Sequence, residues 1–444
     1  MLRRIFYSES LVSDAVQSLL VRITGIGLLF AMTTLSARFL GPDHFGLFNA
    51  TLSLAALLAT LAPLGADRVV VRRLSVIDDT AERGFETAVT HQIALGLGLV
   101  IAIACLTMAT LGDVLWIPAH WQTTILLGTV MFVPIMLAYL RQWIAIPLAG
   151  SRRAVVPEQM MVPVLFIIVL VAMKLLKLEF SGVTACLIYS AICLVVWAGS
   201  LQFPTMAQAY GAAWKQRATP SQLRQRMKES FPFAGIAMSN VLQQKSLPLI
   251  IAATCGFEET AQFAIAISFA NLAGTPVGIA NMCVIPRCTQ HAQRMEHQQA
   301  GQIATVTATA VVVTSVTIGI ATLIFAPYAV LLLGKSYSAF TTLLPFLVAA
   351  AIADSLPGPS MALVQSMQLE REFSRMLLRY IPLQLGVVYL GGLWSGLLGI
   401  TVAYLITRCL WAIMIVTLIY RGRQIMLLPS LNLRTIRRVL SENV

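Results

Sequence analysis

Five ionisable side chains stand inside long stretches of sequence that are otherwise apolar: Arg22, Arg141, Lys245, Asp354 and Arg408. A charge in the middle of a bilayer costs from roughly 3 to above 10 kcal/mol, so such a side chain faces protein or water and is a candidate for ligand binding. Guanidinium and ammonium groups bind anions such as phosphates, whereas a carboxylate attracts cations. Because the cations outnumber the acid, the pattern favours an anionic ligand.

Lys245 lies in the polar segment NVLQQKSLP (240–248), inside an expected membrane helix at 231–253. It is roughly 16–21 Å from either end of that helix at about 1.5 Å per residue, too deep for a lysine stem of about 6 Å to reach water. On a helical wheel the polar side chains spread over about half the circumference. We predict that this arc lines a cavity, with a buried structural pair as the alternative, and the candidate binding residues are Asn240, Gln244 and Lys245.

Three further candidates carry alternatives of their own. Arg22 shares one face of its expected helix with Asp14, and it either lines a cavity or lies in a helix-packing seam, paired with that acid. Arg141 lies near the end of its expected helix, and it either lines a cavity or extends its stem to the membrane surface. Asp354 comes directly before a Pro-Gly-Pro break (ADSLPGPS, 353–360), a pattern that indicates a transport site. The alternative is a kink whose acid is paired with a basic side chain.

The composition is that of an integral membrane protein. The chain has 444 residues, of which 58% are hydrophobic and 11% charged, with a mean hydropathy of +0.80, whereas soluble domains carry about 25% charged residues. The N-terminal stretch has no small-residue cleavage site, so we expect an uncleaved first helix. The net charge of +12 comes without a nucleic-acid-binding motif. Neither a metal site nor a cofactor is predicted, and there is no Walker A sequence for ATP hydrolysis.

About twelve apolar stretches are long enough to cross a membrane: 11–37, 45–65, 88–112, 121–149, 156–178, 181–203, 231–253, 260–285, 303–333, 340–366, 374–395 and 397–420. With a cytoplasmic N-terminus, most of the 31 Lys and Arg fall in cytoplasmic loops. The loops on the other side receive only Arg38, Lys174, Lys177 and Lys335. The positive-inside rule therefore supports this count and predicts a multi-pass protein with both termini in the cytoplasm.

A basic stretch near the middle divides the chain into six expected helices and six. The predicted organisation is an N-terminal six-helix bundle (1–210), a basic cytoplasmic linker (211–230), a C-terminal six-helix bundle (231–424) and a basic cytoplasmic tail (425–444). The segments GPDHFGLFNATLSLA and GFEETAQFAIAISFA align weakly, each beginning just after the first helix of its half. Both halves enter the membrane from the same side, as a parallel repeat requires.

The segment SARFLGPDHFGLFNATLSLAALLATLAPLGADRVVVRRLS (36–75) resembles the first helical hairpin of bacterial oligosaccharide-lipid flippases. These belong to the multidrug/oligosaccharidyl-lipid/polysaccharide exporter superfamily, in which an A-R-x-L-G-P-x-x-[FY]-G stretch is frequent and is matched here from Ala37 to Gly46. The resemblance implies an all-α fold of two six-helix bundles around a central cavity that opens alternately to each side. Relatives often carry an acid in the seventh helix, where this chain has Gln243, Gln244 and Lys245.

What the resemblance implies about function is a flippase of the bacterial inner membrane. Its substrate would be a polyprenyl-pyrophosphate-linked oligosaccharide, the repeat unit of an O-antigen, exopolysaccharide or capsule, moved from the cytoplasmic to the periplasmic leaflet. The implied partners are membrane lipids and polysaccharide assembly proteins. A cation-coupled multidrug exporter of the same superfamily is the first alternative, although only Asp354 supplies a central acid. A polysaccharide polymerase or ligase is the second, but the short outer loops leave no room for a catalytic domain.

Overall fold

The computed structural model describes residues 2–294, 296–425, 427 and 429, so the predicted tail 425–444 lies almost wholly outside the described residues. Helices joined by short connections make up the described chain. The helices of its first part are α1 (Leu2–Leu40), α2 (Pro42–Leu61), α3 (Ala66–Leu74), α4 (Thr80–Thr110), α5 (Ala119–Val156), the π-helix η1 (Pro157–Met161), α6 (Val162–Leu175), α7 (Gly182–Ser200), α8 (Pro204–Ala213) and α9 (Pro220–Thr254). The second part contains α10 (Phe257–Gln293), α11 (His297–Leu333), η2 (Lys335–Tyr337), α12 (Phe340–Ser355), α13 (Ser360–Ser366) and α14 (Glu370–Arg423).

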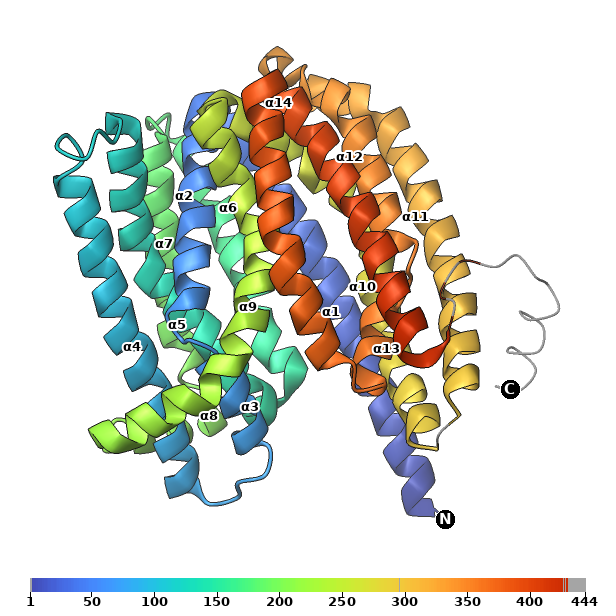
Figure 1. Ribbon diagram of the computed structural model, residues 1–444. Coiled ribbons are helices and arrows are strands. Elements are labelled where there is room, and N and C mark those ends of the chain that lie inside the picture. The colour runs from blue at the N-terminus through green and yellow to red at the C-terminus, as the bar shows by residue number, and fades with distance from the viewer. Residues whose placement is uncertain (1, 295, 426, 428, 430–444) are drawn as a thin grey trace. The chain divides into compact units, whose positions relative to one another are not determined.

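The described helices account for the predicted membrane crossings. Ten helical segments in the described part of the chain are long and apolar enough to cross a membrane. One of them, α14, breaks at Ser395 and Gly396, where the φ angles are −138° and 59°, and so forms two arms that run up and back in Figure 1. A further long helix, α9, falls outside the ten because its middle is polar. The expectation of an all-α protein with about twelve membrane helices is confirmed.

Residue contacts divide the chain into two compact units, Met1–Ala252 and Ala253–Val444, called here the N-terminal and C-terminal units. In the N-terminal unit, α2 packs against α5 and α7, α4 packs against α5 and α8, and α1 packs against α6 and η1 (Figure 1). The predicted linker 211–230 covers the end of α8 and the first turns of α9.

In the C-terminal unit, α10 packs against α11, α12 and α13, and α12 packs against α14. The Pro-Gly-Pro segment separates α12 from α13, as its proline content predicts. Gly358 has a φ of 53° and lies so close to Ala308 of α11 that a side chain would collide there. The amide oxygen of Asn281 on α10 accepts a hydrogen bond from the backbone of Ala362 at 3.1 Å, which holds the start of α13 in place.

The turn between α2 and α3 lies in close contact with the N-terminal part of α9. Gly65 has a φ of 82°, and a Cβ atom there would collide with the carbonyl oxygen of Ser230 and lie 2.6 Å from the backbone nitrogen of Ala234. Glycine is therefore required at this position for two reasons, its left-handed conformation and the close approach of a helix.

A pair of glycine substitutions tests the contact with α9. Gly41 has a φ of 75° and a ψ of 170°, a region reserved almost entirely for glycine, but no atom lies within 4 Å of the place where its Cβ would stand. Gly41→Ala therefore introduces backbone strain of about 1–3 kcal/mol without a collision. Gly65→Ala introduces left-handed strain of about 1–2 kcal/mol and must also displace α9, at a further cost of roughly 1–3 kcal/mol. We expect Gly65→Ala to lower the thermal unfolding temperature in detergent more than Gly41→Ala does. A loss at Gly65 no larger than that at Gly41 would argue against a stabilising contact with α9.

Candidate functional site

The predicted polar arc of α9 has one buried edge and one open edge. Gln243 and Ser246 are each 7% exposed, and the hydroxyl of Ser246 donates to the carbonyl of Leu242 one turn back. Gln244 is exposed, and the side chain of Asn240 lies outside the described residues. Lys245 stands between the two edges, half-buried, and forms no hydrogen bond or ion pair within the described part of the chain. Its ammonium group is therefore available to a ligand.

Arg22 is the second cation of the N-terminal unit without a partner among the described side chains, and it is also half-buried. Its predicted partner Asp14 has a side chain outside the described residues, so that pairing stays a prediction. One turn further along α1, Gly25 packs so closely on η1 that a Cβ there would lie 3.1 Å from Cβ of Gln159. The small residues of this face thus form a packing seam, and Arg22 stands at its edge.

Arg141 of α5 lies in a closed ion pair. Its side chain is 1% exposed, its Nε donates to Oε1 of Glu158 at 2.9 Å, and its Nη2 contacts Oε2 of Glu158 at 2.5 Å. The same Nη2 donates to the carbonyl of Ala154 at 2.5 Å. The kink at Gly150, with a φ of 84°, turns the chain back so that these acceptors cover the guanidinium. Arg141 therefore does not extend to the membrane surface, and a ligand would have to displace Glu158 to reach it.

Asp354 of α12 is paired with Arg408 of α14, within the C-terminal unit. Oδ1 of Asp354 lies 3.5 Å from Nη1 of Arg408, and the two side chains are 40% and 11% exposed, respectively. The guanidinium also lies 5.0 Å from the ring centre of Tyr404, a cation–π arrangement. This is the pairing that the alternative prediction for Asp354 described. The side chain of Asp354 therefore stays partly exposed in spite of this pairing.

A four-residue charge cluster that was not predicted from the sequence joins α3, α4 and α9. The guanidinium of Arg73 lies 3.2 Å from Glu86 and 2.8 Å from Glu229, and that of Arg226 lies 2.6 Å and 3.0 Å from the same two acids. Desolvation raises the pKa of Glu229, but hydrogen bonds and charge interactions with Arg226 and Arg73 lower it by more. The pKa of Glu229 therefore lies below its ordinary value. Glu229 is the only acid in the basic stretch 211–230, which is the signal that could have revealed the cluster.

These contacts sort the membrane charges into two groups. Glu86, Glu158 and Asp354 are each bound by arginine. Six residues were predicted to bind a ligand: Arg22, Arg141, Asn240, Gln244, Lys245 and Asp354. Among those whose side chains are described, no two form a hydrogen bond or ion pair with each other. The N-terminal unit therefore keeps two half-buried cations, Arg22 and Lys245, without a described partner. In the described part of the chain, no group of three or more His, Cys, Asp or Glu could hold a metal ion.

The sequence profile of a family described as polysaccharide biosynthesis protein matches residues 11–292. The chain belongs to this family. No curated protein matches the chain. Solved structures with the same fold are those of transporters.

Solved structures show which fold the family member has. An inward-facing multidrug resistance transporter of the MATE family, in the MOP superfamily, is 16% identical with a TM-score of 0.66, and the match covers 97% of this chain and 100% of that one. An outward-facing transporter of the same description is 15% identical with a TM-score of 0.57, covering 92% and 95%. A mutant of the Vibrio cholerae MATE transporter VcmN is 14% identical with a TM-score of 0.59, covering 94% and 98%. The chain thus has the fold of MOP superfamily transporters.

A double substitution tests whether Arg141 is structural or binds a ligand. Glu158→Gln leaves the buried guanidinium without a counter-charge and should lower the free energy of unfolding by about 3–5 kcal/mol. Arg141→Met combined with Glu158→Leu removes both charges and should recover most of that loss, as measured by thermal unfolding in detergent. The control is Glu372→Gln, which breaks the exposed pair with Arg375 and should change stability by less than about 1 kcal/mol. Full transport by the stable double variant would make the pair structural, whereas loss of transport would make Arg141 a binding residue.

Proposed function

We propose that this family member is a flippase for a polyprenyl-pyrophosphate-linked oligosaccharide, the repeat unit of an O-antigen, exopolysaccharide or capsule. It would carry this lipid from the cytoplasmic to the periplasmic leaflet of the bacterial inner membrane by alternating access. The family match supports the link to polysaccharide biosynthesis, and the fold supports transport. The choice of substrate rests on one observation: Lys245 and Arg22 have no described partner, while Glu86 and Glu158 of the same unit are each bound by arginine.

The physical argument concerns the cost of a poorly solvated cation. An ammonium or guanidinium removed from bulk water loses hydration, and an anion bound beside it restores a counter-charge. Pyrophosphate oxygens accept charge-assisted hydrogen bonds, which are shorter and stronger than neutral ones. The membrane potential would favour outward transport of an anionic substrate, because moving one negative charge outward gains about 2.3 kcal/mol per 100 mV.

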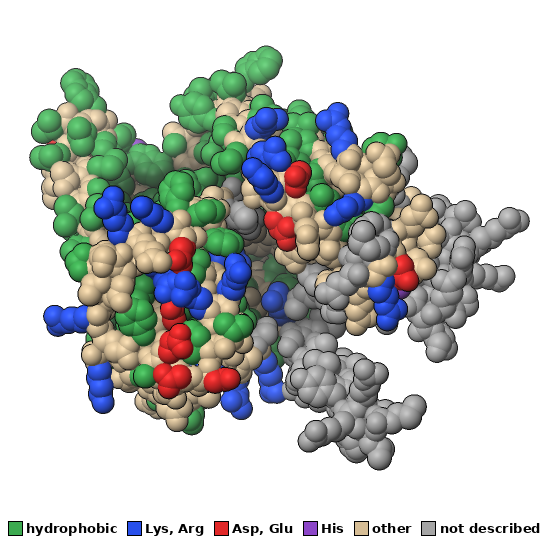
Figure 2. Space-filling model, turned by 60° about the horizontal axis from the view of Figure 1, so that its bottom comes forward, with side chains coloured by type: hydrophobic (Ala, Val, Ile, Leu, Met, Phe, Trp, Pro, Cys, Tyr) green, Lys and Arg blue, Asp and Glu red, His purple; other side chains and the backbone are tan. Residues whose placement is uncertain are grey.

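The orientation of the chain is part of the proposal. Lys and Arg side chains gather on the face shown in Figure 2, which includes the end of the C-terminal unit where α14 begins and ends. The positive-inside rule assigns such a face to the cytoplasm. Both termini would then be cytoplasmic.

A cation-coupled multidrug exporter is the second candidate. Two observations favour it: solved structures with this fold include multidrug resistance transporters, and the carboxylate of Asp354 is 40% exposed, so that a cation could reach it. This candidate assigns no role to the unpaired cations of the N-terminal unit, which is why we place it second.

The first prediction of this proposal concerns Lys245 and Arg22. Lys245→Ala and Arg22→Ala should each lower transport of a lipid-linked oligosaccharide into proteoliposomes roughly 10- to 100-fold, because a charge-assisted hydrogen bond contributes about 1.5–3 kcal/mol. Neither substitution should lower the thermal unfolding temperature, since each removes an unpaired cation rather than half of an ion pair. Lys245→Arg should keep part of the activity.

Matched controls lie on the same two helices. Lys228 on α9 and Arg38 on α1 are exposed, so Lys228→Ala and Arg38→Ala should transport normally. Transport at the normal rate by both Lys245→Ala and Arg22→Ala would refute the proposed pyrophosphate site. If the same variants instead lost export of a cationic drug, the multidrug candidate would replace the flippase.

The second prediction concerns Asp354. Asp354→Asn keeps the shape of the side chain but removes the counter-charge of Arg408. If the pair forms in only one arrangement of the transport cycle, that arrangement should lose stability relative to the other, so that the protein spends less time in it. We expect slower transport with an unchanged amount of protein in the membrane, measured by initial rates at saturating substrate. A normal rate would show that the Asp354–Arg408 pair is only structural.

A further inference from the structure

A basic groove opens in the C-terminal unit between the two arms of α14, near its two ends. It has a volume of about 560 Å³ and is lined by Arg375 and Arg379 from the first arm and Arg421 from the second. Its floor is apolar and includes Ile413, which is 63% exposed. Glu372 is the only acid in the lining and pairs with Arg375 at 3.3 Å. Arg379 and Arg421 form no ion pair within the described part of the chain.

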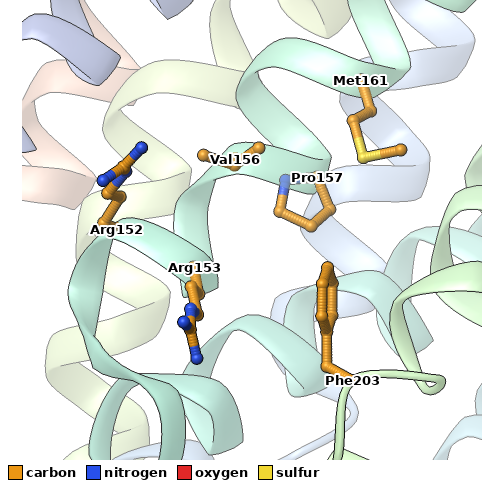
Figure 3. A pocket seen from close by; sticks show the side chains of 6 residues that line it. All are labelled: Arg152, Arg153, Val156, Pro157, Met161 and Phe203. Atoms are coloured by element: carbon orange, nitrogen blue, oxygen red, sulfur yellow. The ribbon is translucent and has the colours of Figure 1, made fainter.

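The N-terminal unit has a second pocket of the same character. It has a volume of about 290 Å³ and is lined by Arg152 and Arg153, with Val156 and Pro157 beside them and Met161 and Phe203 completing it. Figure 3 shows the two arginines on one side and Pro157, Met161 and Phe203 on the other. Met161 and Phe203 are each 45% exposed. No acid lines this pocket.

The two pockets occupy matching places in the two halves of the sequence. Arg152 and Arg153 precede the fifth apolar stretch (156–178), and Phe203 ends the sixth (181–203). Arg375 and Arg379 begin the eleventh stretch (374–395), and Arg421 directly follows the twelfth. Each pocket therefore lies between the fifth and sixth helices of its half, at the level where the apolar helix gives way to basic residues.

We propose that each pocket binds the phosphate headgroup of an anionic membrane phospholipid. Guanidinium groups bind phosphate oxygens in a bidentate manner, and basic pockets between membrane helices on the cytoplasmic side suit such headgroups. The exposed apolar side chains beside the arginines give the acyl chains a surface to pack on. A free phosphate ion would use the arginines alone, whereas a phospholipid uses both parts of each pocket. The two sites do not depend on which substrate the protein carries.

The experiment titrates the purified full-length protein in detergent with phosphatidylglycerol and, separately, with phosphatidylcholine of the same acyl chains, and follows binding by native mass spectrometry. We expect phosphatidylglycerol to bind at least 10-fold more tightly, with two sites per chain. Arg375→Gln with Arg379→Gln should remove one site, and Arg152→Gln with Arg153→Gln should remove the other. The matched controls are Arg371→Gln and Lys215→Gln, exposed cations that line neither pocket, and these should bind as the unaltered protein does.

Three outcomes would overturn the proposal. The first is equal binding of the two phospholipids. The second is unchanged phosphatidylglycerol binding by a pocket variant whose thermal unfolding temperature shows that it is folded. The third comes from competition: a polyprenyl phosphate that displaces phosphatidylglycerol from both pockets, or inorganic phosphate that does so at millimolar concentration, would identify a different ligand. If one pocket variant fails to fold, Arg153→Gln and Arg379→Gln are tested singly, and each should weaken its own site about 10-fold.

Discussion

The cost of a charge away from water governs where ionisable side chains lie in this protein. An isolated ion in an apolar setting is unfavourable by several kcal/mol, so it needs a counter-charge, backbone acceptors or access to water. The guanidinium of Arg141 has both a counter-charge and a backbone acceptor inside the protein, namely Glu158 and a carbonyl oxygen. Asp354 has a counter-charge on one side and an open face on the other. Lys245 has neither a counter-charge nor full exposure. The charges of these three side chains are thus balanced to three different extents, and the proposed binding site is placed where the balance is least complete.

The same constraint explains how a helix with a polar middle is held. The central turns of α9 carry several polar side chains, and specific contacts hold the N-terminal part of this helix. There, Arg226 and Glu229 form the charge cluster with Arg73 and Glu86, and Ser230 packs on a glycine that tolerates no side chain. Burial also raises the pKa of Asp67 in the adjoining helix α3, although the hydroxyl of Tyr139 and the guanidinium of Arg68 lower it in part. These contacts fix the N-terminal end of α9 independently of the packing along its polar middle.

The membrane helices could be predicted from the sequence because length and apolar composition are local properties. The break in α14 at Ser395 and Gly396 fell between two predicted stretches for that reason. Helix ends in water were less predictable: α9 begins at Pro220, well before the expected 231, because its first turns are polar and hydropathy cannot detect them. Ion pairs were harder still. The pairing of Arg141 depends on the Gly150 kink, and the partner of Asp354 lies on another helix far along the chain, so neither follows from local pattern.

The two units differ in a way that bears on how a repeat acquires function. Both units carry a basic pocket, and each pocket is lined by residues at the ends of the fifth and sixth apolar stretches of its half. The buried charges inside the two units need not match in this way, because each unit has to balance only its own charges. In the C-terminal unit the central acid is paired, whereas the N-terminal unit keeps two cations without a described partner. Under the two proposals, phospholipid binding would involve both units, whereas recognition of the charge of the substrate would rest on the N-terminal unit.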